Sequence, residues 1–292
     1  MRLERKQYWI ACLFLLPALA IFGLFFYYPF LQSIYYSFTQ WNGLKAPAFI
    51  GFDNYRYIFS DQQMLDGMKN TLKMVVFGLV VQNPLALLLA LLLNRKFRTR
   101  AFLRTSFYLP IIVSLVVTSI IWGELLKYDG FLNGLLKPII GEAHLQDWLG
   151  TVYTSFPTII LLTQWQGIGY CALIYLAGLQ SIPPDIYEAA DIEGAKGFAL
   201  FRHVTFPMLM PSVTIVLFLT IVGALRLFDL PYLLTNGGPG TSSYTLFLAV
   251  YNAAFKAQNY GYATAAGILL AIFIIIVTVV QLAITRRREV EL

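Results

Sequence analysis

The sequence predicts an all-α integral membrane protein with six transmembrane helices. Of its 292 residues, 58% are hydrophobic and 12% are charged, and the mean hydropathy is +0.67, well outside the composition of soluble globular domains. Apolar stretches close to the roughly 20 residues needed to cross a bilayer recur along the whole chain. Because these stretches are continuous rather than alternating with polar residues, they favour helices over a β-barrel. We therefore expect a single transmembrane domain over residues 1–292.

Six segments account for the apolar stretches. They are residues 9–30, 71–93, 109–126, 153–179, 208–228 and 262–285. The first could be a cleaved signal peptide, because basic residues precede it and Ala18-Leu19-Ala20 has the form of a cleavage site. Its apolar run continues past that point into Tyr27-Tyr28, which is typical of the membrane interface of a retained span. The longest outer connection, residues 31–70, is expected to hold only a hairpin or small helices.

Lysine and arginine residues gather beside one set of span ends. They are Arg2, Arg5 and Lys6 before the first span, Arg95, Lys96, Arg98, Arg100 and Arg104 after the second, and Arg286, Arg287 and Arg288 after the sixth. By the positive-inside rule, both termini are predicted to be cytoplasmic. The net charge of +6 then reflects membrane topology, and nucleic-acid binding is not expected.

The predicted cytoplasmic connection over residues 180–207 has clear local signals. Pro184 suits the first turn of a helix, where backbone N–H groups have no intrahelical partner. Asp185 and Glu188 follow in or near that turn, where carboxylates stabilise the positive end of the helix dipole. We therefore predict a short helix over residues 184–193.

The rest of this connection favours a compact surface. Ala189 and Ala190 leave little side-chain bulk, and Gly194 can turn the chain or let another backbone approach closely. A second short helix over residues 198–205 would return the chain to the membrane, with Pro207 opening the fifth span. An ordinary acidic connecting loop is the alternative reading of these features.

The spacing of this segment resembles a known motif. Glu188-Ala189-Ala190, then Gly194 after three residues, then VTFP at residues 204–207 after nine more, resembles the EAA loop of ABC importer permeases. Val and Phe stand here where Ile and Leu are usual. The resemblance implies the type I ABC importer permease fold. It also implies that Glu188, Ala189, Ala190, Gly194 and Pro207 belong to a coupling segment seated in a cleft of a cytoplasmic ATPase.

Further segments resemble carbohydrate-importer permeases of the maltose type. They are FDL at residues 228–230, LTNGGP at 234–239, FIGFDNY at 49–55 and the Asn70-Thr71 start of the second span. This resemblance implies a carbohydrate cargo, either an oligosaccharide or a sugar derivative. It also implies a heterodimer with a second homologous permease, two ATPase subunits and an extracytoplasmic solute-binding protein. The implied location is the bacterial or archaeal cell (inner) membrane.

No nucleotide-binding motif accompanies these features. The sequence contains no G-x-x-x-x-G-K-[ST] phosphate loop. ATP and Mg are therefore expected in the partner ATPase subunits, with no cofactor in this chain and no catalytic residue. The expected mechanism is alternating access, in which ATP-driven motion of the ATPases moves the coupling segments and exchanges an outward cavity for an inward one.

The sequence TQWQGIGY at residues 163–170 places a polar patch inside the fourth span. Such residues usually face a bundle interior or a water-filled path. Trp165 can stack on a sugar ring, and Gln166, Tyr170 and Thr163 can meet its hydroxyl groups, while Gly167 allows close approach. The alternative is interhelical packing, which also uses small and polar residues.

The resemblance adds to this binding hypothesis. Counted from the EAA loop without gaps, Trp165, Gly167 and Tyr170 match Trp, Gly and Tyr of the maltose permease, whose Trp and Tyr contact sugar. Thr220 falls on a sugar-contacting serine. Gln166 replaces an apolar residue. Two asparagines that contact maltose are also replaced, here by Ala224 and Leu227, which implies a different cargo or a different pose.

The remaining polar residues suggest no metal site or enzyme. Arg226 and Asp229 are three residues apart and could pair on one helix face, or Arg226 could meet an anionic substrate. His144 and His203 have no cysteine or carboxylate at ligand spacing, and His203 is expected to pack in the second coupling turn. An ion-coupled secondary transporter is the main alternative function, but the spans show neither buried carboxylates nor inverted repeats. A membrane-embedded enzyme would need a cluster of reactive side chains that they also lack.

Overall fold

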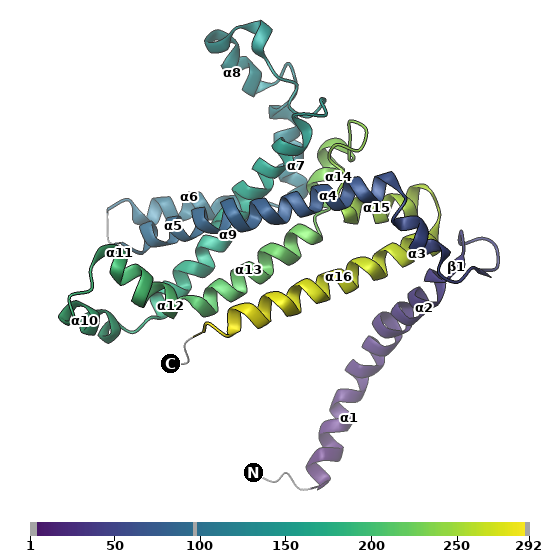
Figure 1. Ribbon diagram of the computed structural model, residues 1–292, viewed down its shortest axis with the longest axis horizontal. Helices are drawn as coiled ribbons and strands as arrows, with labels where there is room; N and C mark the ends of the chain where they lie inside the picture. The colour runs from purple at the N-terminus through teal and green to yellow at the C-terminus, as the bar shows by residue number, and fades with distance from the viewer. Residues whose placement is uncertain (1–4, 96–97, 290–292) are drawn as a thin grey trace. The chain divides into compact units, whose positions relative to one another are not determined.

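The computed structural model describes residues 5–95 and 98–289, so Arg2 and Lys96 of the predicted basic clusters lie outside the described residues. The chain divides into two compact units (Figure 1). The smaller unit runs from the N-terminal part to Asp61 and includes Val250–Ala271. The larger unit comprises Gln62–Ala249 and the C-terminal part from Ile272.

The smaller unit begins with a long helical run followed by a hairpin. Its elements are α1 (Arg5–Phe22), a π-helical turn (Gly23–Tyr27), α2 (Tyr28–Ser37), β1 (Thr39–Gln40), β2 (Ala48–Phe49) and α3 (Asp53–Ile58), with β1 and β2 antiparallel. The first helical run ends seven residues later than predicted, at Ser37 rather than residue 30. The Asn54 amide nitrogen donates to the Ser37 and Thr39 carbonyl oxygens, each at 2.9 Å, and so fixes α3 against the end of that run.

The larger unit contains most of the remaining helices. In chain order the elements from Gln62 onward are α4 (Gln62–Phe77), a π-helical turn (Gly78–Gln82), α5 (Asn83–Asn94), α6 (Arg100–Ile112), α7 (Leu115–Leu125), α8 (Phe131–Ile140), a 3-10 turn (Glu142–His144), α9 (Ser155–Ser181), α10 (Pro184–Ile192), α11 (Gly197–Leu200), a π-helical turn (Phe201–Thr205), α12 (Phe206–Met208), α13 (Met210–Leu225), α14 (Asp229–Thr235), α15 (Leu246–Tyr251), a π-helical turn (Asn252–Lys256) and α16 (Tyr260–Arg286). The end of α15, the turn after it and the first part of α16 belong to the smaller unit.

Five helical runs of the described chain are long and apolar enough to cross a membrane, and a sixth span results if α6 and α7 count as one. The fourth and sixth predicted spans match α9 and α16 within a few residues. The second starts earlier than predicted, because α4 already begins at Gln62 and places Asn70 and Thr71 inside the helix.

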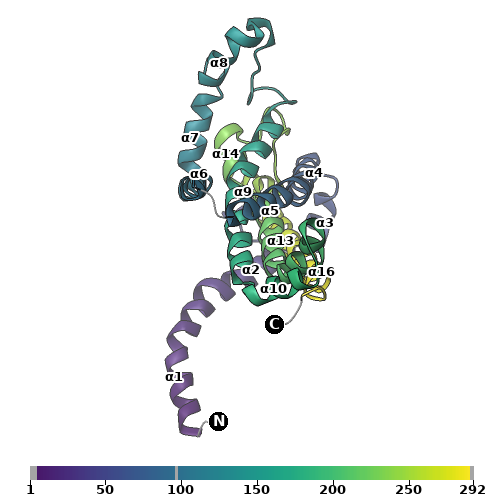
Figure 2. The same cartoon turned by 90° about the vertical axis from the view of Figure 1, so that its left-hand side faces the viewer.

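The prediction of one continuous third span over residues 109–126 is wrong. The axes of α6 and α7 differ by 99°, and Figure 2 shows α7 leaving α6 steeply. Val113 and Ser114 have extended backbone between the two helices, and the Ser114 hydroxyl accepts a hydrogen bond from the Val117 N–H at 3.3 Å. This N-cap satisfies a backbone donor that would otherwise lack a partner, so a new helix starts there.

Three of the π-helical turns end two residues before a proline. Gly23–Tyr27, Gly78–Gln82 and Phe201–Thr205 precede Pro29, Pro84 and Pro207 respectively. A proline inside a helix removes one N–H donor and its ring clashes with the carbonyl four residues earlier. A widened turn accommodates the ring without ending the helix. Pro207 therefore lies within continuing helical structure and does not open the fifth span, which starts as α13 at Met210.

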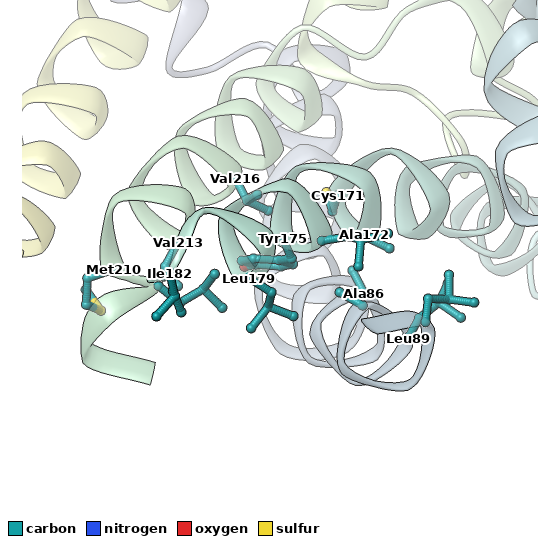
Figure 3. Packing of buried hydrophobic residues seen from close by; sticks show 14 residues of the cluster. Ala86, Leu89, Cys171, Ala172, Tyr175, Leu179, Ile182, Met210, Val213 and Val216 are labelled. Atoms are coloured by element: carbon teal, nitrogen blue, oxygen red, sulfur yellow. The ribbon is translucent and has the colours of Figure 1, made fainter. Parts of the chain in front are cut away.

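The main apolar core of the larger unit joins α5, α9 and α13 (Figure 3). Ala86 and Leu89 from α5 meet Ala172 and Tyr175 from α9, and Val216 from α13 packs against the same cluster. Small residues allow these helices to approach closely, as is usual for transmembrane contacts. This core holds the middle of α9 in place, and the polar patch lies on the same helix.

Candidate functional site

A hollow of about 330 Å³ lies among α4, α9 and α13, beside the break between α6 and α7. Five of the six side chains predicted from the sequence line it. They are Thr163, Gln166, Gly167, Tyr170 and Thr220. Its wall mixes these polar groups with apolar residues, which is the usual composition of a small-molecule site.

Helix rotation explains which members of the patch face this hollow. Thr163, Gln166, Gly167 and Tyr170 are spaced at i, i+3, i+4 and i+7, so they form one stripe along α9. Trp165 lies outside that stripe and lines a separate apolar hollow of about 290 Å³. There its ring meets Trp122 edge to face, with the two ring centres 5.5 Å apart.

Gln166 joins the two sides of the helix break. Its amide nitrogen donates to the Pro110 carbonyl oxygen on α6 and to the Thr118 hydroxyl on α7, each at 3.0 Å. Both hydrogens of this amide are therefore used within the protein. The contacts are those of the packing alternative, and they hold α6 and α7 against α9 at the edge of the hollow.

Gly167 is required by close packing against the preceding span. A Cβ atom at this position would lie 2.6 Å from the Gln82 side chain, a separation that real Cβ contacts do not show. Gln82 in turn donates from its amide nitrogen to the Cys171 sulfur at 3.1 Å. A glycine here thus lets the polar end of Gln82 reach the wall of the hollow.

A buried chain of hydrogen bonds ends at Thr220. The Tyr175 hydroxyl donates to Asn83 Oδ1 at 2.9 Å. The Asn83 amide nitrogen donates to the Gly78 carbonyl oxygen at 2.8 Å and to Thr220 Oγ1 at 3.1 Å. These bonds connect α5, α9 and α13 through polar groups, and one end of the chain faces the hollow.

Sequence reasoning missed several residues that line the hollow or support it. Gln164 is 5% exposed and lines the hollow. Its Oε1 has no hydrogen-bond partner within the described residues, although its amide nitrogen lies 3.7 Å from the Met74 sulfur. Two consecutive polar residues before α5 and at its start were also missed, namely Gln82, which lines the hollow, and Asn83, which donates to Thr220. The signal was present, because polar pairs inside an otherwise apolar span are expensive and usually have a function.

The loop between α9 and α13 forms a second candidate site. The predicted helix over residues 184–193 is α10, and it begins with the expected proline. It ends in a Schellman motif, in which the Gly194 N–H donates to the Asp191 carbonyl at 3.0 Å and the Ala195 N–H donates to the Ala190 carbonyl at 2.9 Å. Gly194 has φ +81°, and nothing lies within 4 Å of a Cβ built on it.

The exposed face of this loop differs in part from the predicted coupling set. Glu188, Ala189 and Gly194 are exposed, but Ala190 is only 7% exposed because it faces the chain's own core. Two apolar side chains that sequence reasoning did not select stand out, namely Ile192 at 88% and Phe198 at 74% exposed. With the neighbouring small residues, these two side chains make the exposed face of the loop a candidate interaction surface.

Two smaller expectations are wrong. No ion pair joins Arg226 and Asp229 in the part of the chain that the structure describes, because α13 ends at Leu225 and Asp229 opens α14, so the two residues do not share a helix face. His203 is exposed rather than packed, with its Nδ1 3.1 Å from the Ala199 carbonyl oxygen. Within the described ranges, no three His, Cys, Asp or Glu side chains gather as metal ligands would.

Comparisons with known proteins agree with this architecture. The model of the family described as "binding-protein-dependent transport system inner membrane component" matches residues 82–290. A probable starch degradation products transport system permease from Thermoanaerobacterium thermosulfurigenes is 36% identical, over 98% of this chain and 96% of the relative. A multiple sugar-binding transport system permease from Streptococcus mutans is also 36% identical, over 98% of each chain.

A solved structure extends the match to three dimensions. It is a bacterial alginate ABC transporter in complex with a periplasmic protein that carries an alginate pentasaccharide. The matching chain has a TM-score of 0.83 and 26% sequence identity, with 97% of this chain and 96% of that chain covered. Together these likenesses place the protein: it belongs to the family of binding-protein-dependent transport system inner membrane components, as a membrane-spanning transport subunit and not an enzyme.

Proposed function

We propose that this chain is one of two homologous permease subunits in an ATP-driven importer for a carbohydrate. The two relatives from Thermoanaerobacterium thermosulfurigenes and Streptococcus mutans are described as permeases for starch degradation products and for multiple sugars, which supports this cargo class. The proposed partners are a second permease, two cytoplasmic ATPase subunits that bind ATP and Mg, and an extracytoplasmic solute-binding protein. Both termini would face the cytoplasm of a bacterial or archaeal cell.

One observation carries the proposal: a single helix connects the two candidate sites. α9 carries the polar stripe from Thr163 to Tyr170 and continues without a break to Ser181, directly before α10. At 1.5 Å per residue, Tyr170 and Ser181 are about 16 Å apart along the helix axis. A displacement at the end of α9 is therefore transmitted to the hollow by one rigid element.

Packing fixes α10 to the same bundle. Ile182, in the two-residue link after α9, is 6% exposed and belongs to the core cluster of α5, α9 and α13. Ile186 and Tyr187 of α10 pack against that cluster. These contacts tie α10 to the core, so a movement of α10 also moves the core. Force applied by an ATPase to the exposed face of the loop would therefore act on the transmembrane helices.

The proposed mechanism is alternating access. ATP binding would close the two ATPases, move α10 and its counterpart in the second permease, and switch the path between outward-open and inward-open states. The hollow offers the Gln164 amide oxygen, which has no partner in the described part of the chain, a partly buried Thr163 hydroxyl and the Tyr170 ring, which is 44% exposed. Amides, hydroxyls and aromatic faces are the groups that recognise sugars.

Uptake by the reconstituted complex tests this proposal. The complex is purified through this chain, reconstituted with its copurifying subunits and binding protein, and supplied with labelled maltose, maltotriose, lactose or trehalose. We expect one of these sugars to accumulate in the vesicles only when ATP is present on the side of the membrane that carries the ATPase subunits. Accumulation that follows a proton or sodium gradient and ignores ATP would instead support the ion-coupled secondary transporter.

A further inference from the structure

The buried chain of hydrogen bonds behind the hollow has a fixed polarity. Its three side chains are almost fully buried, with Tyr175 at 2%, Asn83 at 5% and Thr220 at 7% exposure. Buried polar networks of this kind have few alternative arrangements, because each unpaired group is expensive. The direction of every proton in the chain can therefore be worked out from the chemistry of its members.

The Gly78 carbonyl oxygen sets the orientation of the Asn83 amide. A carbonyl can only accept, so the Asn83 atom 2.8 Å from it must be the nitrogen. The other amide atom is then an oxygen, which requires Tyr175 to donate its proton at 2.9 Å. The second hydrogen of the amide nitrogen points to Thr220 Oγ1 at 3.1 Å. Asn83 thus obliges the Thr220 oxygen to accept.

The Thr220 side chain has little freedom to escape this arrangement. A Cβ atom on Gly78 would lie 2.7 Å from the Thr220 methyl carbon, so the methyl group rests directly on the Gly78 backbone. With the methyl group on the Gly78 side, Oγ1 lies within hydrogen-bond distance of the Asn83 amide nitrogen. Threonine in a transmembrane helix often donates to the carbonyl four residues earlier, but the structure records no such bond for Thr220 among the described residues.

The Thr220 proton is consequently left for the hollow. The one other polar contact recorded for Oγ1 in the described chain is the Cys171 sulfur at 3.7 Å, and sulfur is a weak acceptor. That sulfur already receives the Gln82 amide at 3.1 Å. Thr220 lines the hollow, so an acceptor oxygen on a bound molecule is the strongest partner its proton can find.

We propose that Asn83 and Tyr175 are positioning residues that present the Thr220 hydroxyl to the hollow as a hydrogen-bond donor, so that the site selects carbohydrates placing an acceptor oxygen there. The inference rests on the proposed carbohydrate transport. It adds a direction to one contact of the site, because the Asn83 amide already occupies one lone pair of the Thr220 oxygen while the Thr220 proton has no strong acceptor among the described residues.

Deoxy and fluoro derivatives of the transported sugar test the direction of this contact. Fluorine can accept a hydrogen bond and cannot donate one, whereas a deoxy position can do neither. At one sugar position we expect the deoxy derivative to have a KM about three- to tenfold above that of the fluoro derivative, the range expected for one net hydrogen bond. The sugar is whichever of the four screened compounds the complex accumulates.

Variants assign this difference to Thr220 and to its positioning residues. The deoxy-to-fluoro difference should disappear in Thr220→Val and in the double variant Asn83→Leu with Tyr175→Phe. The second change removes the Tyr175 hydroxyl, which would otherwise be buried without its Asn83 acceptor. Thr220→Ser should retain the difference. The matched control is Thr214→Val, which removes a hydroxyl on the same helix that is 5% exposed and lies away from this hollow. Every variant is assayed with the same binding protein, so discrimination by that protein cancels.

The outcomes separate this inference from the proposed function. The inference is supported if the deoxy-to-fluoro difference in KM is lost in Thr220→Val and in the double variant and is retained in Thr220→Ser and Thr214→Val. A difference that persists in Thr220→Val overturns it, as does a sugar that shows no position at which the fluoro derivative is transported better than the deoxy derivative, because Thr220 would then not donate to the cargo. If no carbohydrate is accumulated with ATP, the proposed function itself fails. Size-exclusion profiles of each complex exclude misfolding as the cause.

Discussion

Gly194 is the position where the coupling proposal can be tested most directly. Its φ of +81° lies in the left-handed region, where a residue with a Cβ is destabilised by about 1–2 kcal/mol. Nothing within 4 Å would clash with an added Cβ. The backbone strain alone therefore lowers the ratio of the native loop conformation to its alternatives by a factor of about 5 to 30. This strain is confined to the loop, so a Gly194→Asp chain should still fold and insert.

Gly141 supplies the matched control for this strain. It ends α8 with φ +76° and ψ 159°, a region essentially restricted to glycine, and it also has open space around a built Cβ. Gly141→Asp should thus strain the backbone at least as much as Gly194→Asp. The two changes differ in place, since only Gly194 lies in the loop proposed to dock on the ATPase.

The assay compares ATP-driven sugar uptake in proteoliposomes and the amount of ATPase that copurifies. We expect Gly194→Asp to lose at least about 90% of uptake, equivalent to about 1.4 kcal/mol of docking energy, and Gly141→Asp to retain most of it. Gly194→Asn, whose side chain tolerates the left-handed region, should show an intermediate loss from bulk alone. Equal losses in the two Asp variants would refute the docking explanation, because strain would then be sufficient.

Three further changes test the hollow and its surroundings. Gln166→Leu removes both hydrogen bonds across the helix break and should lower the free energy of unfolding by about 1–3 kcal/mol; an unchanged thermal unfolding midpoint would contradict the bridging role. Gly167→Ala places a Cβ 2.6 Å from the Gln82 side chain and should raise the KM for the transported sugar several-fold, whereas Gly223→Ala, in the same wall with open space, should not. Trp165→Ala should change KM by about two- to tenfold, the value of an aromatic contact, with the ATPase still associated; unchanged uptake kinetics would exclude Trp165 from the cargo path.

Local signals in the sequence were sufficient for α10 and its cap. Proline at the start, acidic residues in the first turn and glycine after the end all act on neighbouring backbone groups, within a few residues of their own position. For the same reason the lengths of α9 and α16 could be predicted, since each needs only one uninterrupted apolar segment.

Composition alone could not locate the break between α6 and α7. The segment over residues 109–126 is apolar enough for one span, and Ser114 is unremarkable inside it. The bend depends on an N-cap at Ser114 and on Gln166, which comes from another helix about fifty residues later and bonds to both sides of the break. Contacts over such a separation are made by packing and leave no local pattern.

The sequence by itself determined the helical membrane architecture, the family motif and the polar patch inside α9, because each depends on composition or on spacing along one segment. The tertiary structure decided which members of the patch act together. Successive helical residues are rotated by about 100°, so Trp165 and Gln166 are neighbours in sequence but line different hollows. It also decided that Ala190 faces inward while Ile192 faces outward, and that Asn83 and Tyr175 stand behind Thr220, since these relations exist only once separate helices have packed together.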